Sequence, residues 1–175
     1  MPHLYQLFLT LDQDQADELF TSLQEKYQED YEDDKDLSEA DSRKKSQKRM
    51  TERVEDWIGD LTPEQMELVK QWSLSRPLMR QDWYQQQLIN KSELQVLYLQ
   101  RNDSKAFQQK FTSTLLHPEQ FYPEALNRKL QKNRALTYAM FAQVIQGMTD
   151  KQLKHYHEKL REWRETFEAL QENSK

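Results

Sequence analysis

The chain has 175 residues and a formal net charge of −5, and 36% of its residues are hydrophobic, 31% charged and 11% aromatic. Its two glycines are too few for the turns of a many-stranded barrel or for the loops of a nucleotide-binding βαβ unit. The lack of cysteine excludes disulfide scaffolds, thiolate zinc sites and cysteine nucleophiles. Helix-forming polar residues dominate the rest, so the composition predicts an all-α fold, and the length suits a single helical domain over residues 1–175.

Opposite charges gather in two neighbouring segments. Residues 29–36 are mostly acidic, and residues 43–53 carry an excess of lysine and arginine. Such runs are usually solvated helix faces that attract one another across a turn. The alternative is a basic patch for phosphate at residues 44–53, although the negative net charge does not favour a nucleic-acid partner.

The first predicted helix runs from about residue 12 to residue 31. Its apolar residues recur at helical spacing, and it starts at a weak capping pattern beginning at Thr10, with Asp12 and Gln15 as the alternative caps. The segment before it has neither a basic region nor an apolar run long enough for a signal peptide. This indicates a cytoplasmic protein if Met1 is the native start.

The second and third predicted helices are joined by a short turn. The second begins at Ser38 and ends at Gly59, because glycine is typical of the position after a helix. The third begins at Thr62, which forms a capping box with Gln65, and it ends before Pro77.

Three further helices complete the prediction. A long helical region from residue 78 has a kink or break at residues 102–104, and a fifth helix follows from about residue 123 to residue 146. The sixth helix starts with a second capping box, at Thr149 and Gln152. It carries an a/d heptad seam that we expect to pack antiparallel on the fifth helix. The seam consists of Leu153, Tyr156, Leu160, Trp163, Phe167 and Leu170. The whole pattern predicts an antiparallel helical bundle of about six helices, some of them long and kinked.

Four tryptophans fall on the apolar faces of the predicted helices. We interpret them as aromatic anchors of the core. The alternative is a partly open aromatic groove that receives a peptide or a partner helix. The four residues are Trp57, Trp72, Trp83 and Trp163.

No pattern in the sequence predicts catalysis or metal binding. The histidines lack the spacing of metal ligands, and the sequence has no nucleophile elbow and no glycine-rich phosphate loop. We therefore expect a protein that is not an enzyme and that uses no cofactor or metal.

One stretch of the sequence indicates a relationship to other proteins more specifically than the composition does. Between Arg49 and Gln65 the sequence follows the pattern Arg-x-x-x-Arg-x-x-Asp-Trp-x-Gly-x-Leu-Thr-x-x-Gln. This stretch resembles an uncharacterised family of helical envelope lipoproteins from Gram-negative bacteria, and the resemblance extends along most of the chain. The resemblance implies an all-helical periplasmic domain, tethered to a membrane by a lipidated cysteine, with no established activity. Since the chain has no cysteine, we expect it to be the C-terminal portion of such a protein. The capping boxes are also similar to those of periplasmic stress chaperones built from antiparallel helices.

The same stretch supplies the candidate site. The spacing of Arg49, Arg53 and Asp56 puts all three on one helix face. We favour an intramolecular polar network that fixes the corner between the second and third helices, with ligand binding by the arginines as the alternative. The predicted structural or binding cluster consists of Arg49, Arg53, Asp56, Trp57, Thr62, Gln65 and Trp72.

These features predict a non-enzymatic, envelope-associated helical module that binds a protein or peptide partner as a chaperone or scaffold. It would meet a membrane only through the lipid anchor, and no nucleic-acid partner is expected. Two alternatives stay open. One is a structural or assembly protein that dimerises through the C-terminal heptad helix. The other is a cytoplasmic regulator whose basic helix, residues 44–53, contacts nucleic acid.

Overall fold

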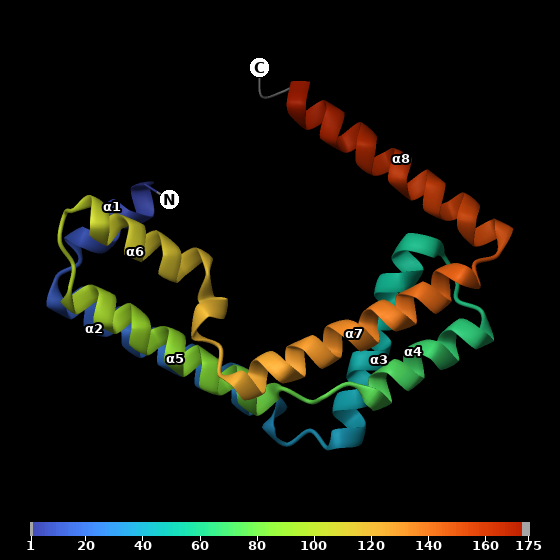
Figure 1. The fold of residues 1–175 in the computed structure, drawn as a ribbon, viewed down its shortest axis with the longest axis horizontal. Helices are drawn as coiled ribbons and strands as arrows, with labels where there is room; N and C mark the ends of the chain where they lie inside the picture. The colour runs from blue at the N-terminus through green and yellow to red at the C-terminus, as the bar shows by residue number, and fades with distance from the viewer. Residues whose placement is uncertain (1, 173–175) are drawn as a thin grey trace. The chain divides into compact units, whose positions relative to one another are not determined.

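The structure is a computed structural model that describes residues 2–172, apart from the side chains of Pro2 and Asp34. Within these residues it contains eight α-helices, one 3₁₀ helix and no β-strand (Figure 1). The prediction of an all-α fold is confirmed. The expected bundle of about six helices is only roughly matched, because the chain forms one helix more at its start and breaks another in two.

The chain divides into two compact units. Unit 1 comprises Met1–Asp36 and Leu78–Leu130, and unit 2 comprises Leu37–Pro77 and Gln131–Lys175. The predicted single helical domain over residues 1–175 thus contains two units.

Unit 1 is a set of paired helices. Within it, α2 lies along α5, and α1 packs on α6 (Figure 1). Its elements are α1 (Pro2–Thr10), α2 (Gln13–Lys35), α5 (Arg80–Leu99), α6 (Lys105–Leu116), the 3₁₀ helix η1 (Pro118–Phe121) and the first turns of α7 (Glu124–Gln146).

The corner between α1 and α2 explains the additional helix. The Thr10 hydroxyl donates to the carbonyl of Leu7 at 2.9 Å, so Thr10 closes α1 and does not cap α2. Asp12 and Gln15 form the cap of α2 instead. The amide of Gln15 donates to Asp12 Oδ1 at 2.9 Å, and the amide of Asp12 donates to Gln15 Oε1 at 3.1 Å. The alternative caps are therefore the ones that form. The acidic run that follows along α2 includes Asp34, whose side chain lies outside the described residues.

The expected kink at residues 102–104 is a complete break between α5 and α6. Ser104 caps the new helix, since its hydroxyl accepts a hydrogen bond from the amide of Phe107 at 3.2 Å. A side-chain cap of this kind satisfies a backbone amide that the first turn of a helix leaves without a partner.

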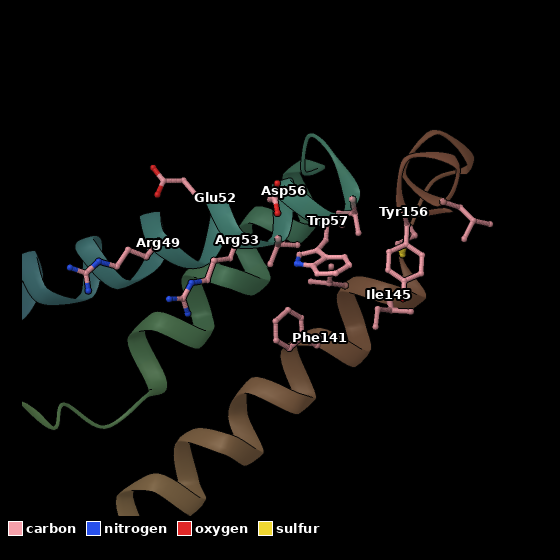
Figure 2. A pocket seen from close by; sticks show the side chains of 13 residues that line it. Arg49, Glu52, Arg53, Asp56, Trp57, Phe141, Ile145 and Tyr156 are labelled. Atoms are coloured by element: carbon pink, nitrogen blue, oxygen red, sulfur yellow. The ribbon is translucent and has the colours of Figure 1, made fainter. Parts of the chain in front are cut away.

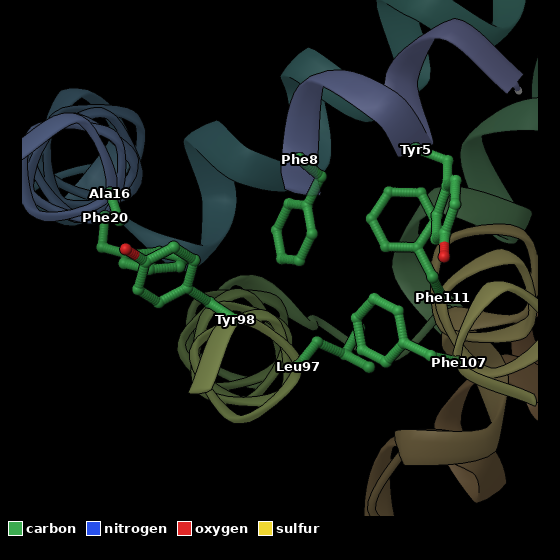
Figure 3. Packing of buried hydrophobic residues seen from close by; sticks show 8 residues of the cluster. All are labelled: Tyr5, Phe8, Ala16, Phe20, Leu97, Tyr98, Phe107 and Phe111. Atoms are coloured by element: carbon green, nitrogen blue, oxygen red, sulfur yellow. The ribbon is translucent and has the colours of Figure 1, made fainter. Parts of the chain in front are cut away.

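An aromatic core fills unit 1 (Figure 3). Phe111 is 2% exposed, and its ring centroid lies 4.9 Å from that of Phe8 and 5.6 Å from that of Tyr5. The ring centroid of Tyr98 lies 6.2 Å from that of Phe8 and 6.1 Å from that of Phe20, and both pairs pack edge to face. Such pairs contribute about 0.5–1.5 kcal/mol each beyond the burial of their area. The rings therefore hold α1, α2, α5 and α6 together.

Unit 2 is built around α3 (Glu39–Ile58), on which both α4 (Pro63–Ser75) and α8 (Asp150–Glu172) pack. The predicted antiparallel packing of the last helix along the preceding one is wrong. The Gln152 amide donates to the carbonyl of Asp60 and Lys159 donates to Asp56, so the first half of α8 is tied to the end of α3 and packs on it rather than back along α7.

The core of unit 2 is mainly aliphatic. Its one buried tryptophan is Trp72, whose indole Nε1 donates to Thr137 Oγ1 at 2.9 Å. At the far end of α4, Arg43 Nη1 donates to the carbonyls of Ser73 at 2.7 Å and Arg76 at 3.1 Å, so part of the basic run holds α3 and α4 together. The buried members of the cluster are Met50, Val54, Ile58, Leu61, Val69, Trp72, Met140 and Val144.

Candidate functional site

Both predicted capping boxes form in unit 2. The amide of Gln65 donates to Thr62 Oγ1 at 3.3 Å, and the amide of Thr62 donates to Gln65 Oε1 at 2.9 Å. Thr149 and Gln152 repeat the arrangement at the start of α8, with distances of 3.2 Å and 3.0 Å. Each glutamine therefore closes the first turn of its own helix.

The two capping glutamines also bind one another. Gln65 Nε2 lies 3.1 Å from Gln152 Oε1, and Gln152 Nε2 lies 2.7 Å from Gln65 Oε1, with both side chains almost fully buried. Gln65 also donates to the carbonyls of Val144 and Gly147, and Gln152 donates to the carbonyl of Asp60 at 2.8 Å. The paired amides thus join the α3–α4 turn to the α7–α8 turn and satisfy carbonyls at the ends of both preceding helices.

Gly59 allows the chain to turn between α3 and α4. Its φ of +77° lies in the region that other residue types rarely adopt, and its amide donates to the carbonyl of Glu55 at 2.8 Å. The ring of His155 on α8 lies 3.7 Å from the place where a Cβ would stand. The predicted helix end at Gly59 is therefore confirmed, and it lies directly against α8.

Beside this corner lies an apolar hollow of about 820 Å³, which is within the range of ligand-binding clefts (Figure 2). Trp57 enters it from α3, Phe141 and Ile145 line it from α7, and Leu153 and Tyr156 line it from α8. The hollow thus lies where three helices of unit 2 meet.

Trp57 is a wall of the hollow and not a core residue. It is 38% exposed, and its indole stacks on that of Trp163 with the ring centroids 6.3 Å apart and the planes 6° apart. Trp163 is 44% exposed and Trp83, in unit 1, is 38% exposed, whereas Trp72 is buried. The interpretation of all four tryptophans as core anchors is therefore correct for Trp72 and wrong for the other three. Because α8 crosses α3, it covers one face of Trp57 and leaves the rest open.

The heptad seam of α8 continues this apolar surface. Leu153 and Leu160 are more than two-fifths exposed, and Phe167 is 61% exposed. Tyr156, the member nearest the α3 crossing, is half-buried, with its ring 6.4 Å from that of Trp57. Adjoining apolar side chains that are open to solvent mark an interaction surface more often than scattered ones do. We call the hollow and this seam together the apolar surface of unit 2.

Charged residues of α3 form the rim of the hollow. Asp56 Oδ1 lies 2.7 Å from Lys159 Nζ on α8, and this hydrogen bond raises the pKa of Lys159. Glu52 Oε1 lies 3.9 Å from Lys48 Nζ. Arg49 and Arg53 are exposed, and neither makes a hydrogen bond or ion pair with any described residue. Arg53 and Trp57 leave α3 on the same side (Figure 2).

The predicted cluster therefore separates into two groups. Thr62 and Gln65 belong to the corner and Trp72 to the core, whereas the remaining members line the hollow. The favoured arginine network at the corner does not form, because the paired glutamines occupy that place. Sequence reasoning also missed the walls supplied by Phe141 and Ile145. Their helical spacing marks them as apolar, but the spacing does not show that α8 leaves them uncovered.

The fold and the hollow define an all-helical protein with an open apolar surface. The chain belongs to a family of unknown function, DUF6279, whose model matches residues 1–127. The resemblance to an uncharacterised family is confirmed to this extent, and residues 128–175, with the second capping box, lie outside the match. No curated protein and no solved structure matches the chain.

Two further properties of residues 2–172 bear on the site. No described helix combines the length and the apolar character needed to cross a membrane. No group of three or more histidine, aspartate or glutamate side chains among the described residues is placed to hold a metal ion.

Proposed function

We propose that this protein is a non-enzymatic helical module that binds an amphipathic helix of a partner protein, as a chaperone or a scaffold does. The observation that carries the proposal is the stacked pair Trp57 and Trp163 at the hollow, with both indoles more than one-third exposed. Large aromatic rings contribute strongly to binding when a partner buries them. An amphipathic helix laid into an apolar groove is a common mode of recognition.

The shape of the apolar surface favours a helix over a small molecule. The hollow alone has the size of a small-molecule site, but the exposed seam continues along α8 through Trp163 to Phe167. A small ligand in the hollow would leave these side chains uncovered. A helix with apolar residues at heptad spacing would cover both parts at once.

A spectroscopic titration tests the proposal. The probe is a synthetic amphipathic peptide of three heptads with leucine at each a and d position, and the readout is tryptophan fluorescence together with anisotropy of a labelled peptide. We expect saturable binding that Trp57→Ala weakens about tenfold or more, as for a central aromatic contact. Trp83→Ala, which changes an equally exposed tryptophan of unit 1, is the matched control and should bind normally. Equal loss in both variants, or no binding at all, would contradict the proposal.

The exposed seam also favours a second candidate, an assembly protein that dimerises through α8. Light scattering over a range of concentrations distinguishes the two, because a dimer formed by the seam dissociates on dilution and is lost in Phe167→Lys. A monomer at every concentration supports binding of a different protein.

An envelope location is part of the proposal and rests on the resemblance carried by the stretch from Arg49 to Gln65. Fractionation of cells that express the native gene with a C-terminal tag tests it. Recovery with the envelope fraction is expected, and recovery in the cytoplasmic fraction would contradict this part of the proposal.

A further inference from the structure

On the basis of the function proposed above, we propose that the bound helix is acidic, with carboxylates that pair with Arg49 and Arg53 while its apolar face covers Trp57 and the α8 seam. The partner is thus assigned by its charge as well as by its amphipathic form.

The first observation is the state of the two arginines. Lys159, which bonds to Asp56 at the rim of the hollow, has a partner in unit 2, and so does Arg43, which pairs with Glu39 at the start of α3. Arg49 and Arg53 have none among the described residues, although they lie one helical turn apart at the rim of the hollow. Two guanidinium groups at this spacing match carboxylates one turn apart on a facing helix.

A second observation concerns Arg76, whose guanidinium lies over the ring of Trp72 at 5.0 Å. Its Nε is buried without a hydrogen-bond partner in the described part of the chain. Burial lowers the pKa of Arg76, and the positive charges of Arg43 and Arg49 lower it further. Arg49 therefore adds to a positive potential that an incoming carboxylate would reduce.

The third observation comes from the flanks of the α8 seam. Leu160 and Phe167 are at a positions and Trp163 is at a d position, so between Leu153 and Leu170 the e and g positions hold cations or neutral side chains, and the nearest carboxylate at such a position is Asp150, before the seam begins. These flanking residues are His157, Lys159, Arg164 and Thr166. In a parallel pair of α8 helices, Lys159 would face Arg164 of the copy, and like charges at these positions oppose pairing. The flanks therefore suit an acidic helix better than a second copy.

The outer face of α8 argues against an anionic membrane as the occupant. Between residues 158 and 168 that face carries Glu158, Glu162, Glu165 and Glu168 against one cation, Arg161, so the helix presents an excess of carboxylates close behind this part of its apolar seam. A flat anionic surface would meet these carboxylates along with the arginines. A single helix can lie along the seam and reach Arg49 and Arg53 without meeting them.

The test compares three synthetic peptides with the same leucine seam and with glutamate, glutamine or lysine at the flanking positions. We expect the glutamate peptide to bind about tenfold or more tightly than the glutamine peptide, and the lysine peptide to bind most weakly. The advantage of the glutamate peptide should shrink as salt is raised from low to molar concentration, because salt screens exposed charges.

Variants connect the charge preference to the two arginines. The double variant Arg49→Gln/Arg53→Gln should lose most of the preference for the glutamate peptide over the glutamine peptide. Lys44→Gln/Lys132→Gln is the matched control, since it removes the same charge from exposed positions of unit 2 that do not line the hollow. This control should keep the preference, and circular dichroism confirms that both variants are folded.

The outcomes separate this proposal from the function on which it rests. Equal binding of the glutamate and glutamine peptides by the unchanged protein would overturn the acidic partner and leave helix binding intact. If none of the peptides binds, both proposals fail. Displacement of the glutamate peptide by phosphatidylglycerol vesicles, or a concentration-dependent dimer that excludes it, would overturn the proposal in favour of a lipid surface or a second copy.

Discussion

The two units use their aromatic residues in opposite ways. Unit 1 buries its rings, with Phe111 and Tyr98 both almost inaccessible to solvent, and the rings form the contacts between its helices. Unit 2 has a mainly aliphatic core and leaves Trp57 and Trp163 at its surface. The buried rings of unit 1 therefore stabilise the fold, while Trp57 and Trp163 of unit 2 are open to solvent. An aromatic-rich sequence does not by itself distinguish these two roles.

Polar groups differ between the units as well. Unit 2 joins its two turns through the buried amide pair of Gln65 and Gln152. In unit 1 the buried Gln86 donates to its neighbour Asn90 on the same helix at 2.8 Å, so it connects no separate segments. Removing a buried aromatic ring should therefore lower the free energy of unfolding through unit 1. Removing a buried side-chain amide should lower it through unit 2.

The largest effect on stability is expected for Phe111→Ala. Removing a fully buried phenyl ring costs about 3–5 kcal/mol, through lost burial and the cavity that remains. Phe167→Ala, at an exposed position of α8, should change the free energy of unfolding by about 0.5 kcal/mol or less. Urea denaturation followed by circular dichroism measures both. Similar losses in the two variants would show that Phe167 is covered in solution and would remove the contrast between the units.

A smaller but still large effect is expected for Gln65→Ala. The substitution removes a helix cap, takes one partner from each end of the Gln152 amide and leaves the carbonyl of Val144 without the amide that donates to it, at a cost of about 2–4 kcal/mol. The matched control is Gln71→Ala on the same helix, where the exposed amide bonds only to Glu67 and the change should stay below about 0.5 kcal/mol.

A double-mutant cycle sharpens the result. Replacing Gln65 and Gln152 together by methionine should cost less than the sum of the two single replacements, because no amide is then left unpaired. Additive losses would mean that the two side chains contribute independently and that the amide pair does not join the turns.

The smallest effect concerns pH. The hydrogen bond to Asp56 raises the pKa of Lys159 above its ordinary value of 10.5. The contribution of this contact is therefore complete below that value and is lost as the pH rises through the higher pKa of the folded state. Near-ultraviolet circular dichroism should show weaker stacking of Trp57 on Trp163 as the pH is raised above 10.5. Lys159→Met should lack this transition, and an identical transition in the variant would assign it to another group.

Local features of the fold were predictable because they are contained within a few residues. The caps at Ser38, Thr62 and Thr149 each need a side chain and an amide three positions apart, and all three form. The turn at Gly59 follows equally from one residue type. Asp12 and Gln15 form a capping box of the same kind. The sequence left open only whether this pair or the neighbouring pattern at Thr10 would cap the helix.

The exposure of the tryptophans could not be predicted in this way. Trp57, Trp72 and Trp163 share the same position on an apolar helix face, yet one is buried and two are not. The difference depends on which helix covers which face, and this is set by the contact of Gln65 with Gln152, 87 residues apart. A heptad seam indicates that a helix is amphipathic, but it does not identify the helix on which the seam packs.

The positions of the paired glutamines limit how far the chain can be truncated. Gln65 lies inside the segment that the family model matches, and Gln152 lies outside it. A fragment that stops at residue 127 would keep α3 and α4 but would lose Met140 and Val144 from the core that covers them. We expect such a fragment to aggregate, whereas one that continues through α8 stays soluble. The segment that the family model matches is therefore shorter than the segment that we expect a folded chain to need.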